Sequence, residues 1–284
     1  MDTNTSKGLN IKTRRLIAHV TLILITLLCL FWFYVLIINA TRSHGEMTKG
    51  FSPIPSKYLL TNWKNLLAGT QPILSGMFNS IFVASCTAAL SVYFSAMTAY
   101  AIHAYEFKGK KAIFTFILMI MMIPTQVTSL GFLQLIGKMK LDDSFIALIV
   151  PSVAAPITFF YMKQYLESTL PLSIVEAARI DGSGEFRTFN SIVLPLMKPA
   201  LAVQAIFTFV TSWNNYFIPA LVLHTESKKT LPILIAQLRG ADFLKFDMGQ
   251  VYVMIAFSIL PVVIVYLILS KFIIQGVALG GVKG

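Results

Sequence analysis

The architecture of this chain is decided by an apolar stretch near its start, LIAHVTLILITLLCLFWFYVLIIN, which runs from Leu16 to Asn39. As a helix with a rise of 1.5 Å per residue, this stretch measures about 36 Å, which exceeds the roughly 30 Å hydrocarbon core of a bilayer. No small-residue cleavage pattern follows it, so a cleavable signal peptide is not expected. The stretch predicts a membrane-spanning helix.

The remainder of the chain has the same character. Of its 284 residues, 56% are hydrophobic and 12% are charged, whereas soluble domains have about 45–50% and about 25%. Unpaired backbone groups cannot face lipid, and the apolar segments are too long for barrel strands, so they are predicted to be helices. We expect an all-α polytopic membrane protein with one membrane domain, residues 16–275. Its six transmembrane helices are expected near residues 16–39, 73–103, 111–136, 144–161, 199–223 and 250–274.

Flanking positive charge predicts the orientation. Lys7, Lys12, Arg14 and Arg15 precede the first span, whereas only Arg42 closely follows it. The positive-inside rule therefore places the N-terminus (1–15), the 162–198 loop and a C-terminal tail (276–284) in the cytoplasm. The net charge of +11 is attributed to such tracts and to contact with membrane lipid. No nucleic-acid partner is expected.

Residue types within the segments suggest how the helices pack. The second segment is rich in Ala, Ser and Thr, which let helix backbones approach closely, so this helix is expected to be buried among the others. Prolines in several segments either line a pathway or are tolerated in ordinary packing. Cys29 and Cys86 are expected to be packing residues.

The 162–198 loop contains LPLSIVEAARIDGSGEFRTFNSIVLPLMKP, residues 170–199. Ser173 and Glu176 have capping-box spacing, so a helix is predicted to begin at Ile174 and to stop at Gly182. A second helix is expected from Glu185 to a point before Pro195. The first helix is either a docking surface for another protein or an amphipathic helix on the inner membrane face.

The motif Glu176-Ala-Ala-Arg-Ile-Asp-Gly182, followed by Ile192-Val-Leu-Pro195 and Pro199, resembles the EAA loop of ABC-importer permeases. The resemblance implies the type I ABC-importer permease fold and a coupling helix that sits in a cleft of a cytoplasmic ATPase. Ser183 stands where the family often has Ala. By resemblance, Glu176 and Gly182 take the coupling positions. The residues expected at the ATPase are Glu176, Ala177, Ala178, Arg179, Asp181 and Gly182.

Two further stretches, Ser212-Trp-Asn-Asn-Tyr-Phe-Ile-Pro219 and the tail Gly276-Val-Ala-Leu-Gly-Gly-Val-Lys-Gly284, are similar to carbohydrate-type permeases related to the smaller maltose-transporter permease. That resemblance implies the cell membrane of a prokaryote. In this subfamily the tail reaches toward the ATPases, so Gly280, Gly281 and Lys283 are expected to contact them. The alternative is a frayed terminus.

The expected function is that of a permease subunit in an ATP-driven importer of a sugar or oligosaccharide. Its implied partners are a second homologous permease, two ABC ATPases and an extracellular solute-binding protein. The sequence has no phosphate-binding loop, so ATP and Mg²⁺ are expected to be used by the partner ATPases, and this chain to bind no cofactor. Its four His residues are scattered, so an enzyme is not expected.

Two alternatives stay open: a permease for a non-sugar solute, and an ion-coupled secondary carrier, which would be expected to carry more ionisable residues within its spans. Polar residues of the fifth segment either line a solute path or join helices. They are Gln204, Thr208, Thr211, Ser212, Asn214 and Asn215. Trp213 is either a membrane-interface anchor or a sugar-stacking ring.

Overall fold

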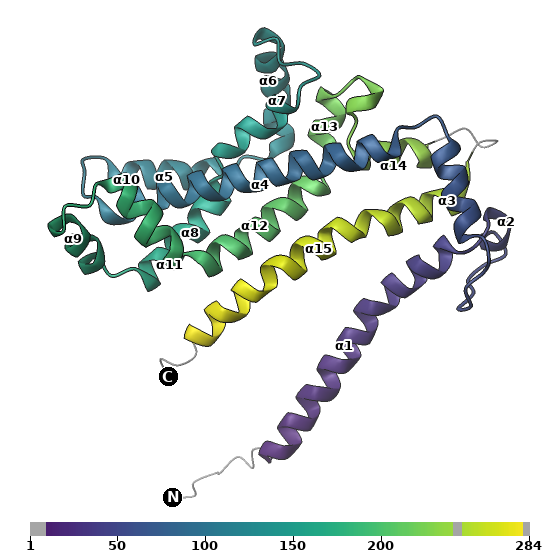
Figure 1. Cartoon of the computed structure of the whole chain (residues 1–284), viewed down its shortest axis with the longest axis horizontal. Coiled ribbons are helices and arrows are strands. Elements are labelled where there is room, and N and C mark those ends of the chain that lie inside the picture. Colours follow the sequence, from purple (N-terminus) through teal and green to yellow (C-terminus); the bar gives the residue numbers. More distant parts are fainter. Residues whose placement is uncertain (1–9, 241–245, 281–284) are drawn as a thin grey trace, which may run out of the picture. The chain divides into compact units, whose positions relative to one another are not determined.

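The computed structural model describes residues 10–240 and 246–280, with the backbone alone described from 274 onward, and within these ranges it contains helices and no strands (Figure 1). The chain divides into two compact units, Met1–Gly69 with Leu238–Phe257, and Thr70–Gln237 with Ser258–Gly284. The all-α fold class predicted from the sequence is confirmed.

The first unit contains α1 (Ile11–Ala40), α2 (His44–Met47), α3 (Leu59–Ala68) and the beginning of α15 (Met248–Gly280). The second unit contains the remaining helices and the rest of α15. In chain order these are α4 (Ile73–Ala104), α5 (Lys110–Ile120), α6 (Thr125–Lys138), α7 (Phe145–Ile149), η1 (Val150–Val153), α8 (Pro156–Thr169), α9 (Leu172–Ile180), α10 (Glu185–Thr188), the π-helical η2 (Phe189–Val193), α11 (Leu194–Leu196), α12 (Lys198–Trp213), α13 (Phe217–Val222), η3 (Glu226–Lys228) and α14 (Leu231–Arg239).

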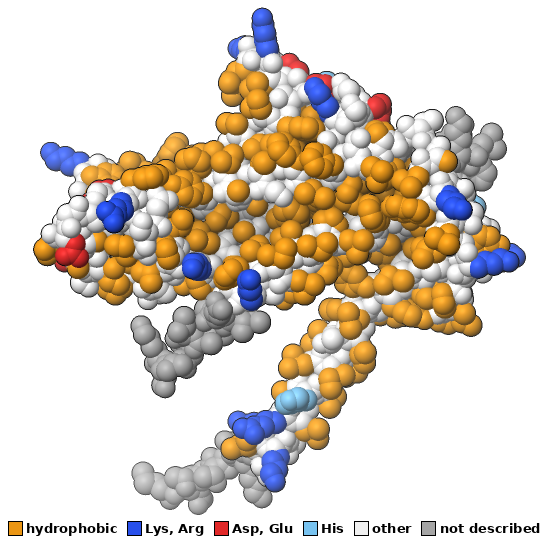
Figure 2. Space-filling view, in the orientation of Figure 1, with side chains coloured by type: hydrophobic (Ala, Val, Ile, Leu, Met, Phe, Trp, Pro, Cys, Tyr) orange, Lys and Arg blue, Asp and Glu red, His pale blue; other side chains and the backbone are white. Residues whose placement is uncertain are grey.

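Four helical stretches of the described chain are long and apolar enough to cross a membrane: α1, α4, Phe145–Thr169 and Met248–Ile273. The number rises to six if two bent helix pairs each form one span. Hydrophobic side chains cover most of the face seen in Figure 2, and the Lys and Arg side chains gather near helix ends and loops. This distribution suits a protein whose solvent is lipid.

Three of the expected spans are not single helices, and one of them, near residues 144–161, consists of α7, η1 and the first part of α8. Over residues 111–136, α5 and α6 meet at 99°. The bend lies at Pro124, which has no N–H to donate and takes an extended backbone as the N-cap of α6. Over residues 199–223, α12 ends at Trp213 and α13 follows after a short break, while α12 itself turns 81° from the Glu185–Leu196 helix.

At the C-terminus, α15 continues to Gly280 through the first part of the expected 276–284 tail. Gly281 and Lys283 lie outside the described residues, as does the side-chain environment of the segment that ends at Gly280.

Helix α4 is the centre of the second unit and packs along both α8 and α12. In an 18-residue apolar stretch of α4, 44% of the stretch is buried inside the protein. The corresponding share for α1 is 6%. Ala84, Ala96 and Ala99 are fully buried, and Ser91 and Ser95 nearly so. The prediction of a buried, small-residue helix is therefore confirmed, because small side chains let α8 and α12 approach its backbone.

Candidate functional site

The first residues of the expected 162–198 loop still belong to α8, which continues to Thr169. The next helix is α9, whose start differs from the prediction. Pro171 is the N-cap, and Ser173 lies in the first turn without a capping hydrogen bond. The predicted capping box is therefore wrong. The physical reason lies in Pro171, whose ring holds φ at −62° while its ψ of 135° leads directly into the helix, so the helix begins at Leu172.

The end of α9 is as predicted. Gly182 has a φ of +77°, and its N–H donates to the Arg179 carbonyl at 3.0 Å. The next N–H, of Ser183, donates to the Ala178 carbonyl at 2.9 Å. These two bonds form a Schellman motif, which satisfies the last carbonyls of a helix and places glycine in the left-handed region.

The second helix of the loop begins at Glu185 as predicted but does not end before Pro195. It continues through a π-helical turn, η2, to Leu196. The Leu194 N–H donates to the carbonyl of Phe189, five residues earlier. This wider turn precedes Pro195, whose ring would otherwise clash with a carbonyl of the preceding α-helical turn.

The loop packs on the end of α4 with one face and exposes the other. Val175 and Phe189 belong to a buried cluster with Tyr100, Ile102 and residues of α8. On the exposed face, Ile180 is 86% and Phe186 is 71% accessible. The loop therefore presents two large apolar side chains on its exposed face. The exposure of Phe186 was not predicted, because exposure cannot be read from a short non-periodic segment.

A polar cluster joins α9, α10 and the end of α4. Glu185 accepts hydrogen bonds from Arg179 Nε at 2.7 Å and from the Tyr100 hydroxyl at 3.1 Å. The Arg179 guanidinium lies over the ring of Tyr105, 5.2 Å from its centroid. Arg179, and then the Tyr105 hydroxyl, lower the pKa of the Glu185 carboxyl below its ordinary value.

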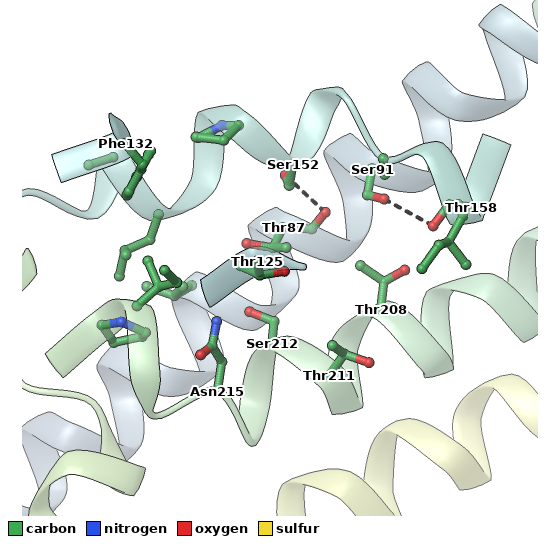
Figure 3. Close-up of a pocket in the computed structure, with 18 of the residues that line it drawn as sticks. Thr87, Ser91, Thr125, Phe132, Ser152, Thr158, Thr208, Thr211, Ser212 and Asn215 are labelled. Carbon is green, nitrogen blue, oxygen red and sulfur yellow. Dashed lines mark hydrogen bonds between the residues drawn. The ribbon is translucent and has the colours of Figure 1, made fainter. Parts of the chain in front are cut away.

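The second unit also holds a cavity of about 710 Å³, walled by α4, α6, α7, α8, α12 and α13 (Figure 3). Its polar lining is entirely hydroxyl and amide, and none of the lining residues is charged. Ser91 donates to the Thr158 hydroxyl at 3.4 Å, and Ser152 donates to the Thr87 carbonyl at 3.4 Å. The polar lining side chains are Ser80, Thr87, Ser91, Thr125, Thr128, Ser129, Ser152, Thr158, Gln204, Thr208, Thr211, Ser212, Asn215 and Thr230.

Two of these hydroxyls lack a partner. Within the described residues, the Thr87 and Thr230 side-chain oxygens are buried and make no hydrogen bond. A buried hydroxyl without a partner is unfavourable by about 1–3 kcal/mol, so such groups need water or a ligand. In the same described part of the chain, no group of three or more His, Cys, Asp or Glu side chains is placed to hold a metal ion.

Comparison with known proteins assigns the family. Residues 91–279 match the family described as binding-protein-dependent transport system inner membrane component. This match includes the whole 162–198 loop and most of the cavity wall. The chain belongs to this family. Helix α1 lies outside the matched residues.

Members of this inner membrane component family resemble the chain over most of its length. It is 34% identical to the arabinooligosaccharides transport system permease protein AraQ of Bacillus subtilis, over 92% of this chain and 93% of that protein. It is 30% identical to the trehalose/maltose transport system permease protein MalG of Thermococcus litoralis, over 95% and 98%. It is also 30% identical to the sn-glycerol-3-phosphate transport system permease protein UgpE of Yersinia enterocolitica, over 91% and 94%.

The fold of this family member also matches a solved structure. A chain in the crystal structure of a bacterial ABC transporter involved in the import of the acidic polysaccharide alginate superposes with a TM-score of 0.77 at 22% identity. The match covers 93% of this chain and 99% of the other. At this identity the likeness concerns the fold alone.

In this family member, the residues expected at an ATPase do not all face outward. Glu176, Ala177, Asp181 and Gly182 are exposed, and so is Arg179. Ala178 is only 5% accessible, and the Arg179 side chain is paired with Glu185. The exposed part of the motif is therefore smaller than the sequence suggested.

The structure likewise divides the residues expected on a solute path. Gln204, Thr208, Thr211 and Asn215 line the cavity together with Ser212, whereas Asn214 is exposed and does not line it. Trp213 is 4% accessible and stacks on Phe209 at 5.8 Å, so it is neither a lipid-facing anchor nor a cavity residue. The cavity residues of α4, α6 and α8 escaped prediction because their segments read as ordinary spans.

Proposed function

We propose that this chain is one permease subunit of an ATP-driven importer for a sugar or oligosaccharide. The observation that carries the proposal is the outward-facing Glu176–Gly182 segment of the 162–198 loop, presented on the fold of the inner membrane component family. The closed end of α9 and the exposed Ile180 side chain support docking of this segment into an ATPase cleft, and Phe186 adds a second exposed apolar side chain further along the loop.

The lining of the cavity supports an uncharged, polyhydroxylated solute. Hydroxyl and amide groups both donate and accept hydrogen bonds, so they can replace water around sugar hydroxyls. An anionic solute would need a cation or helix terminus nearby, because burying an unpaired charge is strongly unfavourable. Of the relatives' named solutes, arabino-oligosaccharides, trehalose and maltose therefore fit this lining better than glycerol 3-phosphate.

The proposed complex has two homologous permeases, two ABC ATPases and an extracellular binding protein. The N- and C-termini and the 162–198 loop face the cytoplasm, and the ATPases bind ATP and Mg²⁺. ATP-driven closure of the ATPases moves the docked loops, and the helix bundles rock between outward and inward access. This chain then transmits the movement through its docked loop and forms part of the cavity wall.

The test is affinity purification of the tagged chain from its native membrane in mild detergent, followed by uptake assays in liposomes. We expect an ABC ATPase, a second permease and a binding protein to co-purify, and uptake of a neutral oligosaccharide to require ATP. Glu176→Lys should reduce co-purification of the ATPase while the chain still inserts. A chain that purifies alone and transports without ATP would instead be a secondary carrier. ATP-driven uptake of an anion in preference to sugars would indicate a non-sugar permease.

A further inference from the structure

Helix α9 is fastened to the last turn of α4 at both of its ends. At its start, His103 Nε2 of α4 lies 3.0 Å from the Leu170 carbonyl, just before α9. At its end, Arg179 donates to Glu185, and Glu185 in turn accepts from the Tyr100 hydroxyl of α4. We call the group Tyr100, Tyr105, Arg179 and Glu185 the Glu185 brace.

Glu185 is the centre of this brace because each of its carboxylate oxygens contacts a different helix. One oxygen accepts from Arg179 of α9 at 2.7 Å, and the other accepts from Tyr100 of α4 at 3.1 Å. Tyr100 is 3% accessible and stacks on Phe189 of η2, with ring centroids 5.7 Å apart. The brace therefore joins three elements, and one of its members is anchored in the core.

An isolated ion pair of this exposure would contribute little. The Arg179 and Glu185 side chains are 37% and 43% accessible, and exposed ion pairs typically contribute little to stability. This ion pair differs from an isolated one because each charged group has a second partner. The Tyr100 hydroxyl donates to Glu185, and the Arg179 guanidinium lies over the Tyr105 ring. The brace is better suited to fixing the direction of α9 than to stabilising the fold.

The same α4 helix reaches the cavity. Ser91 of α4 lines the cavity, and Tyr100 lies nine positions later on an unbroken helix, which corresponds to about 14 Å. Close-packed helices have low compressibility and transmit strain along their length. A displacement of α9 would therefore be carried through the brace to the cavity wall.

We infer that Glu185 is a positioning residue that couples the α9 segment to α4, so that movement of a docked ATPase is converted into movement of the cavity wall. The inference rests on the proposed function, because it needs the ATPase at α9. It also gives Arg179 a role within the chain, because its Nε donates to Glu185.

The test uses the complete complex reconstituted in liposomes, with uptake and ATP hydrolysis measured in the same preparation. Glu185→Gln removes the charge, and Tyr100→Phe removes one oxygen atom from a side chain that otherwise keeps its packing. We expect each variant to lower solute molecules taken up per ATP hydrolysed by about threefold or more. The apparent KM for solute and the amount of co-purified ATPase should stay as in the wild type.

The double variant and a matched control sharpen the result. Glu185→Gln combined with Tyr100→Phe should transport no worse than Glu185→Gln alone, because the two residues act through one contact. The control is Glu167→Gln, since Glu167 also pairs with a cation one turn away, Lys163, and is 45% accessible. It should leave uptake per ATP unchanged.

Three outcomes would overturn the inference: normal uptake per ATP in both single variants, additive losses in the double variant, or loss of co-purified ATPase from Glu185→Gln, which would place Glu185 in the docking surface. The proposed function is judged separately on the wild-type complex. If that complex lacks an ATPase or takes up solute without ATP, the proposed function fails whatever the variants do.

Discussion

Gly182 occupies the one position of the 162–198 loop where the backbone requires a left-handed conformation, with a φ of +77°. A Cβ at this position would meet no atom within 4 Å, so any effect of substitution is conformational and not steric. L-residues with a side chain are disfavoured here by about 1 kcal/mol, and Asn less than Ala. The end of α9 therefore depends on a backbone preference.

We predict that Gly182→Ala weakens the end of α9 by about 1 kcal/mol, whereas Gly182→Asn has a smaller effect. Hydrogen exchange of the Gly182 and Ser183 region in the purified complex measures this, because these amides close the Schellman motif. Gly184→Ala is the control, since Gly184 has a φ of −67° and equally open surroundings. Equal acceleration of exchange in both alanine variants would contradict the prediction.

Ser173 gives a second prediction at the same scale. Because Pro171 is the N-cap, the Ser173 hydroxyl caps nothing. Ser173→Ala should change the stability of α9 by less than about 0.5 kcal/mol, since an exposed helix position loses no contact and Ala favours helix. Hydrogen exchange over 174–180 is the measurement. A loss near 1 kcal/mol would mean that Ser173 does cap the helix.

Among the elements, the connection before α7 is tied to the segment after α13 by Asp143. Its carboxylate accepts from the His224 N–H at 2.9 Å and from the Thr225 hydroxyl at 2.7 Å, and Lys228 Nζ lies 3.0 Å away. The Thr225 hydroxyl, followed by the Thr225 N–H, holds the pKa of Asp143 well below its usual range. Asp143 itself has a φ of +55°, which its partners maintain.

A lowered pKa gives this contact a defined pH dependence. Its stabilising effect is complete above the usual Asp pKa of about 3.9 and is lost as the pH falls through the lower folded-state value. Asp143→Asn should therefore lower the protection of the amides around residues 223–228 at neutral pH, measured relative to intrinsic exchange at the same pH. The variant should also lack the loss of protection that we expect in the wild type on acidification. The adjacent Asp142→Asn is the control. An unchanged exchange rate at neutral pH in Asp143→Asn would show that Asp143 does not hold this segment.

At the scale of the whole molecule, the cavity predicts how solute recognition responds to loss of one hydroxyl. Thr208 lines the cavity from α12, and Thr208→Val keeps its volume while removing about 0.5–1.5 kcal/mol of hydrogen bonding to a sugar. We expect the apparent KM for the neutral solute to rise by roughly two- to tenfold. Uptake assays with the reconstituted complex measure it. The control is Thr98→Val, because Thr98 is exposed on α4 and bonds its own helix at 2.8 Å; equal effects would contradict a role of the cavity.

Much of the fold follows from residues close together in the chain. The length of the 16–39 stretch predicts α1, and small residues predict the buried α4. The glycine at 182 predicts the end of α9 because a positive φ is a local property. The predicted cap at Ser173 with a helix start at Ile174 and the predicted helix end before Pro195 were wrong, because Pro171 and the π-helical turn offered competing local solutions.

The sequence by itself therefore determined that the protein lies in a lipid membrane and that its fold is helical. It also carries the loop motif that indicates the family. Only the tertiary structure decided that Ala178 is buried, that Arg179 pairs with Glu185 and that Asn214 lies off the cavity. It also brought Thr87, Thr125 and Thr230 to one cavity. The physical reason is range: helix class and glycine turns depend on neighbours within a few positions, whereas the cavity depends on helices that are distant in sequence and on the 99° bend between α5 and α6.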